Sequence, residues 1–398
     1  MKPLVRRARF PGLPLLPILA LLSACGWLST EPPAPPTGLA ATGALGVIHL
    51  SWTSGGPVVG HNIYRSTDNV TFVKRNGDKV GGTTYDDAID SPAGDGVFYH
   101  YRITAEDSKE SEPSATVRAI HGTRLAAAYV AGFASDNTAS PYVLEGTTVV
   151  DGGNFVLKDG DKLYLLDNAV LDLEQGNDVT IQGLLRVLAA SGDSHATITS
   201  YRVSAPLAPG EGFSITLDTT DDFNPTDNSG TWIRNTLLSN LATGQAFRIS
   251  NCSPRIENCK AVSNDNTGAS YLSIEAGGGP TLRNCSFDNM TLRVSDGDLF
   301  PTLAMENNIF TNSYYAVSFW NLVGPGVDPG QIANNVFDGR KRAYLWNVTG
   351  ANVPLDNNFW SDASPVPTVL RGGTTPVTVT YSFDPALLEA PSSGGPDW

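Results

Sequence analysis

Histidine, cysteine and methionine are scarce in this 398-residue chain, which has five, four and three of them respectively. Only His195 lies between residues 125 and 391, so most histidine-based metal sites, catalytic triads and acid–base pairs are excluded from that stretch. The cysteines form no Cys-x-x-Cys pair and no Cys/His spacing typical of zinc. Redox or zinc chemistry therefore has no support in the sequence.

Basic residues and long apolar runs are also few. Lys and Arg total 26 against 40 Asp and Glu, a formal net charge of −14, which argues against nucleic acid as a partner. No stretch beyond the N-terminus is apolar enough to span a bilayer. In contrast, the chain has 40 Gly and 27 Pro and only 17% charged residues. That composition is typical of an all-β protein with many turns.

The N-terminus predicts export. Basic residues lie between Lys2 and Arg9, an apolar stretch follows over residues 13–22, and small residues precede Cys25. This pattern predicts a secretory signal peptide over residues 1–24. The tetrad Leu-Ser-Ala-Cys at 22–25 resembles the bacterial lipobox, which implies that Cys25 becomes the lipidated first residue of the mature chain. Gly26 follows where retention in the inner membrane would favour Asp, so we expect a lipid anchor in the outer membrane, on its periplasmic or surface face.

Two further segments precede the main part of the chain. Residues 25–36 end in Glu-Pro-Pro-Ala-Pro-Pro, a stiff spacer. Residues 37–122 alternate apolar and polar residues in short runs, which predicts half-buried antiparallel strands. Leu50-Ser51-Trp52 and the alternating run from Tyr99 to Ala105 resemble a fibronectin type III domain, in which Trp52 would be a core residue and Tyr99 the tyrosine corner. We expect an exposed connection to the next domain at 121–124.

Residues 123–391 repeat, and residues 392–398 are expected to form a flexible tail. Six segments share an apolar residue, any residue, Asn and then a small or polar residue, and their starts are separated by 23, 26, 23, 27 and 23 residues. A period of this length marks units that bury their apolar faces by stacking. The third residue of each segment is Asn235, Asn258, Asn284, Asn307, Asn334 and Asn357.

Three short strands and three turns consume about one such period, so the repeat predicts a parallel β-helix whose first coils occupy residues 155–217. In-register stacking at about 4.8 Å would align the six asparagines in a hydrogen-bonded ladder. Leu replacement of Asn307 is therefore expected to cost more stability than replacement of Asn308. The ending Asn357-Asn358-Phe359-Trp360 resembles that of pectin-lyase-like proteins, which implies a right-handed parallel β-helix.

Candidate ligand-binding residues come from the strand before each Asn segment. Alternation places Arg248, Ser273 and Arg293 outward on successive coils, with Glu275 nearby. Such a row either grips an acidic sugar or is a solvated face of the sheet. The aromatic side chains of Trp320 and Trp346 either form a sugar-stacking surface or lie inward in the core.

Four carboxylates and three cysteines complete the set of candidate residues. Asp218, Asp221, Asp222 and Asp227 lie in one loop dense enough in carboxylates to be a weak Ca²⁺ candidate, with a solvated loop as the alternative. No other cofactor is expected. The cysteines at 252, 259 and 285 are expected to be free thiols, with the last two stacked on adjacent coils.

Two functions are compatible with these features. The first is a membrane-anchored, monomeric cell-envelope lipoprotein whose β-helix is a scaffold that binds polysaccharide or another envelope component. The alternative is a polysaccharide lyase or glycoside hydrolase acting on the same face, since the pectin-lyase resemblance implies such enzymes. Binding is favoured because no constellation of two carboxylates and a base is evident at coil spacing.

Overall fold

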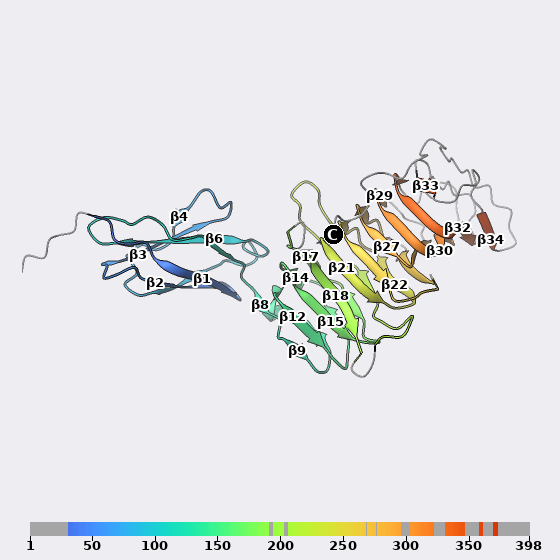
Figure 1. Ribbon diagram of the computed structural model, residues 1–398, viewed down its shortest axis with the longest axis horizontal. Coiled ribbons are helices and arrows are strands. Elements are labelled where there is room, and N and C mark those ends of the chain that lie inside the picture. Colours follow the sequence, from blue (N-terminus) through green and yellow to red (C-terminus); the bar gives the residue numbers. More distant parts are fainter. Residues whose placement is uncertain are drawn as a thin grey trace, which may run out of the picture. The chain divides into compact units, whose positions relative to one another are not determined.

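The computed structural model describes residues 31–190, 194–202, 206–267, 269–275, 277–295, 303–321, 331–346, 358–360 and 369–372. Within these residues the regular secondary structure is β-strand, apart from one 3₁₀ turn at Asn137–Ala139 (η1). No helix in the described residues has the length and apolarity needed to span a membrane. The strands and the lack of any α-helix among the described residues confirm the predicted all-β fold class (Figure 1).

The N-terminal strands form two sheets. The three-stranded sheet has the order β1 (Thr37–Ala44), β2 (Val47–Thr53), β5 (Thr84–Ala88), and the four-stranded sheet has the order β4 (Val73–Lys74), β3 (Gly60–Ser66), β6 (Tyr99–Glu106), β7 (Val117–Ala119). Strand β3 pairs antiparallel with β4 and β6. Trp52 is 6% exposed and Tyr101 is fully buried, so the alternating runs bury the faces that their sequence predicts.

The rest of the described chain winds as a right-handed parallel β-helix with three strands in most coils. Strands of successive coils pair in parallel and form three rows. The first row, a nine-stranded sheet, contains β8 (Thr123–Arg124), β11 (Tyr142–Leu144), β14 (Lys162–Leu165), β17 (Leu184–Val187), β20 (Trp232–Arg234), β23 (Arg255–Glu257), β26 (Thr281–Arg283), β29 (Ala304–Glu306) and β31 (Gln331–Ala333).

The second row follows the first within each coil. It contains β9 (Ala128–Tyr129), β12 (Thr147–Val150), β15 (Val170–Glu174), β18 (Ala196–Tyr201), β21 (Thr236–Leu241), β24 (Lys260–Ser263), β27 (Ser286–Asp288), the starts of β30 (Ile309–Trp320) and β32 (Val336–Trp346), and β33 (Phe359–Trp360).

The third row carries most of the residues predicted to bind ligand. It contains β10 (Phe133–Ala134), β13 (Phe155–Leu157), β16 (Val179–Ile181), β19 (Ile215–Asp218), β22 (Gly244–Ser250), β25 (Ser270–Ile274), β28 (Met290–Ser295), the ends of β30 and β32, and β34 (Val369–Gly372). The strands predicted over residues 155–217 and the strand before each Asn segment are thus present, but the first coil begins at β8, before residue 155.

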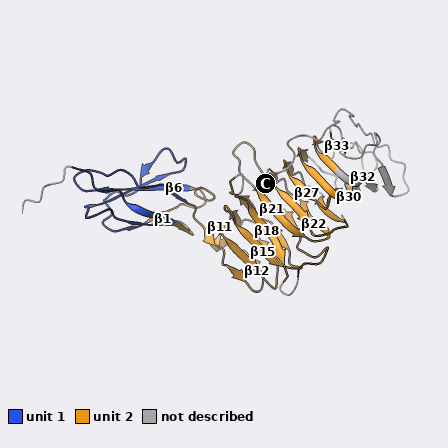
Figure 2. Ribbon diagram, in the orientation of Figure 1, with its two compact units in different colours: residues 1–41, 50–85, 99–118 blue, residues 42–49, 86–98, 119–398 orange. Residues whose placement is uncertain are grey.

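The chain divides into two compact units, one of residues 1–41, 50–85 and 99–118, the other of residues 42–49, 86–98 and 119–398 (Figure 2).

The prediction that residues 121–124 form an exposed connection is wrong. His121 is fully buried, its Nε2 lies 3.1 Å from Asp95 Oδ1, and Lys162 Nζ lies 2.7 Å from the other oxygen of that carboxylate. Burial lowers the pKa of His121. The reason is that this segment already leads into β8, the first strand of the first row.

The predicted Asn ladder is displaced by one residue. Asn235, Asn258, Asn284, Asn307 and Asn334 do occupy one turn position, all with φ between 47° and 57°. Asn tolerates this left-handed conformation, which turns the chain from the first row into the second. The only side-chain hydrogen bond between neighbours among these described asparagines is a 3.5 Å contact from Asn258 to Asn235. Asn357 lies outside the described residues.

The hydrogen-bonded ladder belongs to the following residue, which the turn directs into the core. Asn308 Nδ2 donates to Asn335 Oδ1 at 2.9 Å, and Asn335 Nδ2 donates to Asn358 Oδ1 at 3.0 Å. The backbone N–H groups of Asn308 and Asn335 donate to the same two oxygens, and both side chains are fully buried. The expectation that Asn307 matters more than Asn308 is therefore wrong.

Two cysteines, Cys259 and Cys285, occupy the same inward position in earlier coils, whereas Cys252 lies between the third row and the first. Cys252, Cys259 and Cys285 are free and buried. Lys260 pairs with Ser286, so the two preceding cysteines stack on adjacent coils, as predicted. The Sγ atoms of both also lie 3.2 Å from the backbone oxygen two residues earlier. Burial raises the pKa of the Cys285 thiol.

Candidate functional site

The structure brings most of the predicted ligand-binding residues onto one face. Arg248 pairs with Ser273, Ser273 with Arg293, Arg293 with Ser318 and Ser318 with Tyr344, so one outward position of the third row continues through five coils. Two of the five are exceptions, because the side chains of Ser273 and Ser318 are buried; the Ser273 hydroxyl donates to Glu275 at 3.2 Å. Ser273 is therefore not available to a ligand.

Arg248 and Glu275 form the polar part of this face. Arg248 Nε lies 2.7 Å from Glu275 Oε2, and Gln245 Nε2 donates to Glu275 Oε1 at 2.7 Å. The Glu275 side chain is 14% exposed and that of Arg248 is 37% exposed. Because Arg248 uses one edge of its guanidinium for Glu275, the carboxylate holds it in place while other N–H groups remain directed elsewhere.

Aromatic residues form the other part of the face. Arg293 Cζ lies 4.5 Å from the ring centroid of Trp320, which lies 5.3 Å from that of Tyr344 and 5.7 Å from that of Trp346. The Tyr344 ring also stacks on that of Tyr315 at 5.0 Å. We call the residues Arg293, Trp320, Tyr344 and Trp346 the aromatic row.

The aromatic row resolves the alternative that the sequence left open. Val317 and Phe319 are fully buried in the core, whereas Trp320 is only partly buried and Trp346 is 40% exposed. The two tryptophans therefore lie outside the core, on the outward face. The rings of Tyr344 and Trp346 are tilted by 51° and 32° to that of Trp320, and together they present an apolar area with polar groups at its edges, which suits the apolar face of a sugar ring.

The structure does not bring together the aspartates at 218, 221, 222 and 227, the weak Ca²⁺ candidate of the sequence. Among the described residues, no group of three or more His, Cys, Asp or Glu side chains is placed to hold a metal ion. Asp218 accepts hydrogen bonds from Ser250 and Asn251, Asp222 accepts one from the backbone of Ser253, and Asp227 accepts one from that of Ser229. These carboxylates fix the loop and its neighbours instead of converging.

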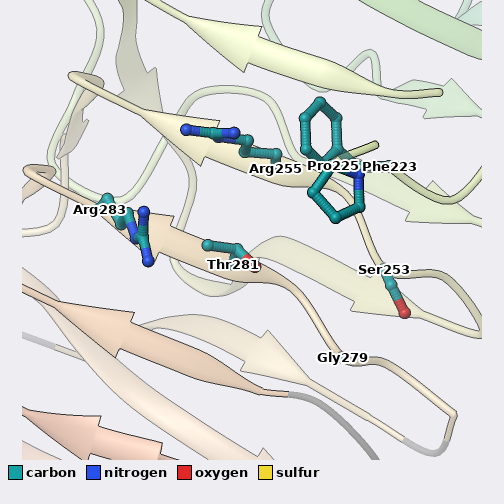
Figure 3. A pocket seen from close by; sticks show the side chains of 7 residues that line it. All are labelled: Phe223, Pro225, Ser253, Arg255, Gly279, Thr281 and Arg283. Carbon is teal, nitrogen blue, oxygen red and sulfur yellow. The ribbon is translucent and has the colours of Figure 1, made fainter. Parts of the chain in front are cut away.

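One grouping was missed from the sequence. The outward face of the first row carries Trp232 with three guanidinium carbons near its ring, those of Arg186, Arg234 and Arg255 at 5.9, 4.6 and 5.2 Å. Beside it lies a depression of about 310 Å³, lined by Phe223, Pro225, Ser253, Arg255, Gly279, Thr281 and Arg283 (Figure 3). The sequence could have indicated this grouping. In each Asn segment the residues directly before and after the apolar residue point outward, because side chains alternate along a strand.

No family model matches the chain, and no curated protein matches it. Among solved structures, an Fn3-like protein from Clostridium thermocellum is similar at 26% identity over 22% of this chain and 92% of its own, with a TM-score of 0.20. Pectate lyase PelI from Erwinia chrysanthemi, solved with tetragalacturonic acid, is similar at 13% identity over 88% of this chain and 100% of its own, with a TM-score of 0.20. A family 28 exopolygalacturonase from Yersinia enterocolitica is similar at 9% identity over 88% of this chain and 85% of its own, with a TM-score of 0.21.

Proposed function

We propose that this chain is a cell-envelope lipoprotein whose β-helix binds polysaccharide on the outward face of the third row. The observation that carries the proposal is the aromatic row, in which rings from adjacent coils lie within 5.3–5.7 Å of one another with Arg293 beside them. A parallel β-helix repeats this outward position at about 4.8 Å along its length, so one extended chain can contact several coils. The N-terminal sheets and the Pro-rich segment would act as a spacer from the membrane.

Replacing Trp346 with Ala tests the proposal. An exposed aromatic anchor typically contributes 1–3 kcal/mol, so we expect the affinity for the polysaccharide to fall by about 5- to 150-fold. A glycan array identifies the polysaccharide, and calorimetric titration of the wild type and variant measures the affinity. Tyr85→Ala, which removes a partly buried aromatic side chain from β5, is the matched control. Unchanged affinity in Trp346→Ala, or an equal loss in the control, would contradict the proposal.

A second candidate function is cleavage of the bound polysaccharide. It is favoured by the positions of Asp218 and Glu275, which lie on either side of Ser250 on successive coils, with Arg248 bonded to the second carboxylate. Two carboxylates about two coil spacings apart are near the separation that an inverting hydrolase uses. The titrated samples distinguish the candidates. A binding protein leaves the polysaccharide intact, whereas a hydrolase or lyase releases new reducing or unsaturated ends.

The lipid anchor is a separate part of the proposal. Replacing Cys25 with Ser removes the thiol that the lipobox resemblance implies is acylated, so we expect the variant to be unlipidated and uncleaved by the lipoprotein peptidase. Incorporation of a labelled fatty acid and the apparent mass measure both effects. Cys252→Ser, which changes a thiol far from the signal, should keep the label. Wild-type chain that is processed yet extracted without detergent would contradict the anchor.

A further inference from the structure

The depression on the first row is a separate candidate site, on a different strand row from the aromatic row. Arginines collect there although the chain as a whole carries a formal net charge of −14. Arg186, Trp232, Arg255 and Thr281 share one outward position on successive coils. Arg234, Glu257 and Arg283 share the next outward position. The face therefore combines cationic and aromatic side chains in neighbouring coils.

Each of the two arginines of the depression lies near an acidic side chain. Arg255 Nη2 lies 2.5 Å from Glu257 Oε1, and Arg283 Nε lies 3.5 Å from Glu306 Oε2. The Arg255 guanidinium also lies 5.0 Å from the ring centroid of Phe223. Its Nε is buried and has no hydrogen-bond partner among the described residues. Each guanidinium has five N–H groups, so donors remain for a ligand after these contacts.

A loop fixed by hydrogen bonds forms the wall of the depression. Residues 219–230 connect the third row to the first and are tied to the next coil, because Phe223 N donates to the Ser253 carbonyl and Ser253 N donates to Asp222. Gly230, at φ 83°, closes the loop so tightly that a Cβ there would lie 1.9 Å from the Asp222 oxygen. In Figure 3, Phe223 and Pro225 lie on this wall, and Thr281 and Arg283 lie on β26, the strand that pairs with the strand of Arg255.

We propose that this depression is a second saccharide site, which takes one sugar unit bearing an oxyanion group, a carboxylate or a sulfate. The volume of about 310 Å³ is at the lower end of the range for small-molecule sites, which suits a single ring. The ring packs against Phe223 and Pro225, while the oxyanion accepts hydrogen bonds from Arg255 and Arg283. Guanidinium groups match the geometry of such oxyanions and are strongest where partly shielded from water. The hydroxyl of Thr281, between them in the lining, faces the ring.

The test uses cellotriose, cellotriose oxidised to carboxylates at its C6 positions, and cellotriose sulfated at the same positions, each titrated calorimetrically into the full chain. We expect an oxidised or sulfated trimer to bind and unmodified cellotriose to bind at least tenfold more weakly. Arg283→Gln should weaken acidic binding at least tenfold, because it removes a charged donor from a half-exposed side chain. Arg202→Gln, which alters another ion-paired and exposed arginine, should stay within twofold of the wild type.

The three trimers distinguish the possible oxyanions, and the two variants distinguish binding at the depression from binding at the aromatic row. Preference for the oxidised or for the sulfated trimer identifies the oxyanion. Equal affinity for neutral and acidic trimers, no binding of any acidic trimer, or no effect of Arg283→Gln in a variant with unchanged melting temperature would overturn the proposal. Acidic binding that is lost in Trp346→Ala but kept in Arg283→Gln would place the ligand on the aromatic row. That result would overturn the second site and leave the proposed function standing.

Discussion

Replacing Phe310 with Ala should lower the free energy of unfolding by about 3–5 kcal/mol, the usual cost of removing a fully buried phenylalanine. Its ring is in the middle of a stack, 4.7 Å from Phe287 and 5.3 Å from Phe337 between centroids, and all three side chains are at most 1% exposed. The two neighbouring rings cannot close the gap without moving their own coils, so the cavity remains.

Denaturant unfolding followed by circular dichroism measures this loss. Phe310→Leu keeps most of the volume and should cost about half as much or less, while Tyr314→Ala on the exposed side of the same strand should cost under about 1 kcal/mol. Equal effects of Phe310→Ala and Tyr314→Ala would contradict the inward position assigned to Phe310.

Replacing Asn335 with Leu should cost at least about 3 kcal/mol, because it leaves several buried polar groups without partners. Asn335 accepts from the backbone and side chain of Asn308 and donates to Asn358 and to the backbone oxygens of Met305 and Ala333. Each stranded buried group costs about 1–3 kcal/mol.

The matched control is the preceding residue. Asn334 has φ 57°, and glycine adopts that conformation freely, so Asn334→Gly should cost less than about 1 kcal/mol. The same unfolding measurement compares the two variants. A larger loss in Asn334→Gly than in Asn335→Leu would restore the ladder position that the sequence alone indicated.

The fold was predictable because its signal is repeated. Six segments with an apolar residue two positions before Asn, separated by 23 to 27 residues, require stacked coils of that length whatever the details of each loop. The ladder position was not predictable in the same way. Asn307 and Asn308 are adjacent and identical in type, and only the left-handed φ of the first shows that the second turns inward.

The candidate sites were likewise predictable only in part. Alternation within one strand was enough to place Arg248 and Arg293 outward at one position of the third row. It failed for Ser273, since whether a small outward side chain is covered depends on its larger neighbours. The depression near Trp232 depends on a loop that folds across coils, and pairing by strand alternation does not indicate where such a loop packs.

Oxidative footprinting with bound polysaccharide tests most directly the claim that the aromatic row binds a glycan. Hydroxyl radicals modify exposed tryptophans, and mass spectrometry reports the change at each one. With a neutral polysaccharide ligand, we predict that oxidation of Trp346 and Trp320 falls severalfold, while that of Trp232 on the first row is unchanged. Protection of Trp232 without protection of Trp346, or no protection of either at saturating ligand, would contradict the proposed binding face.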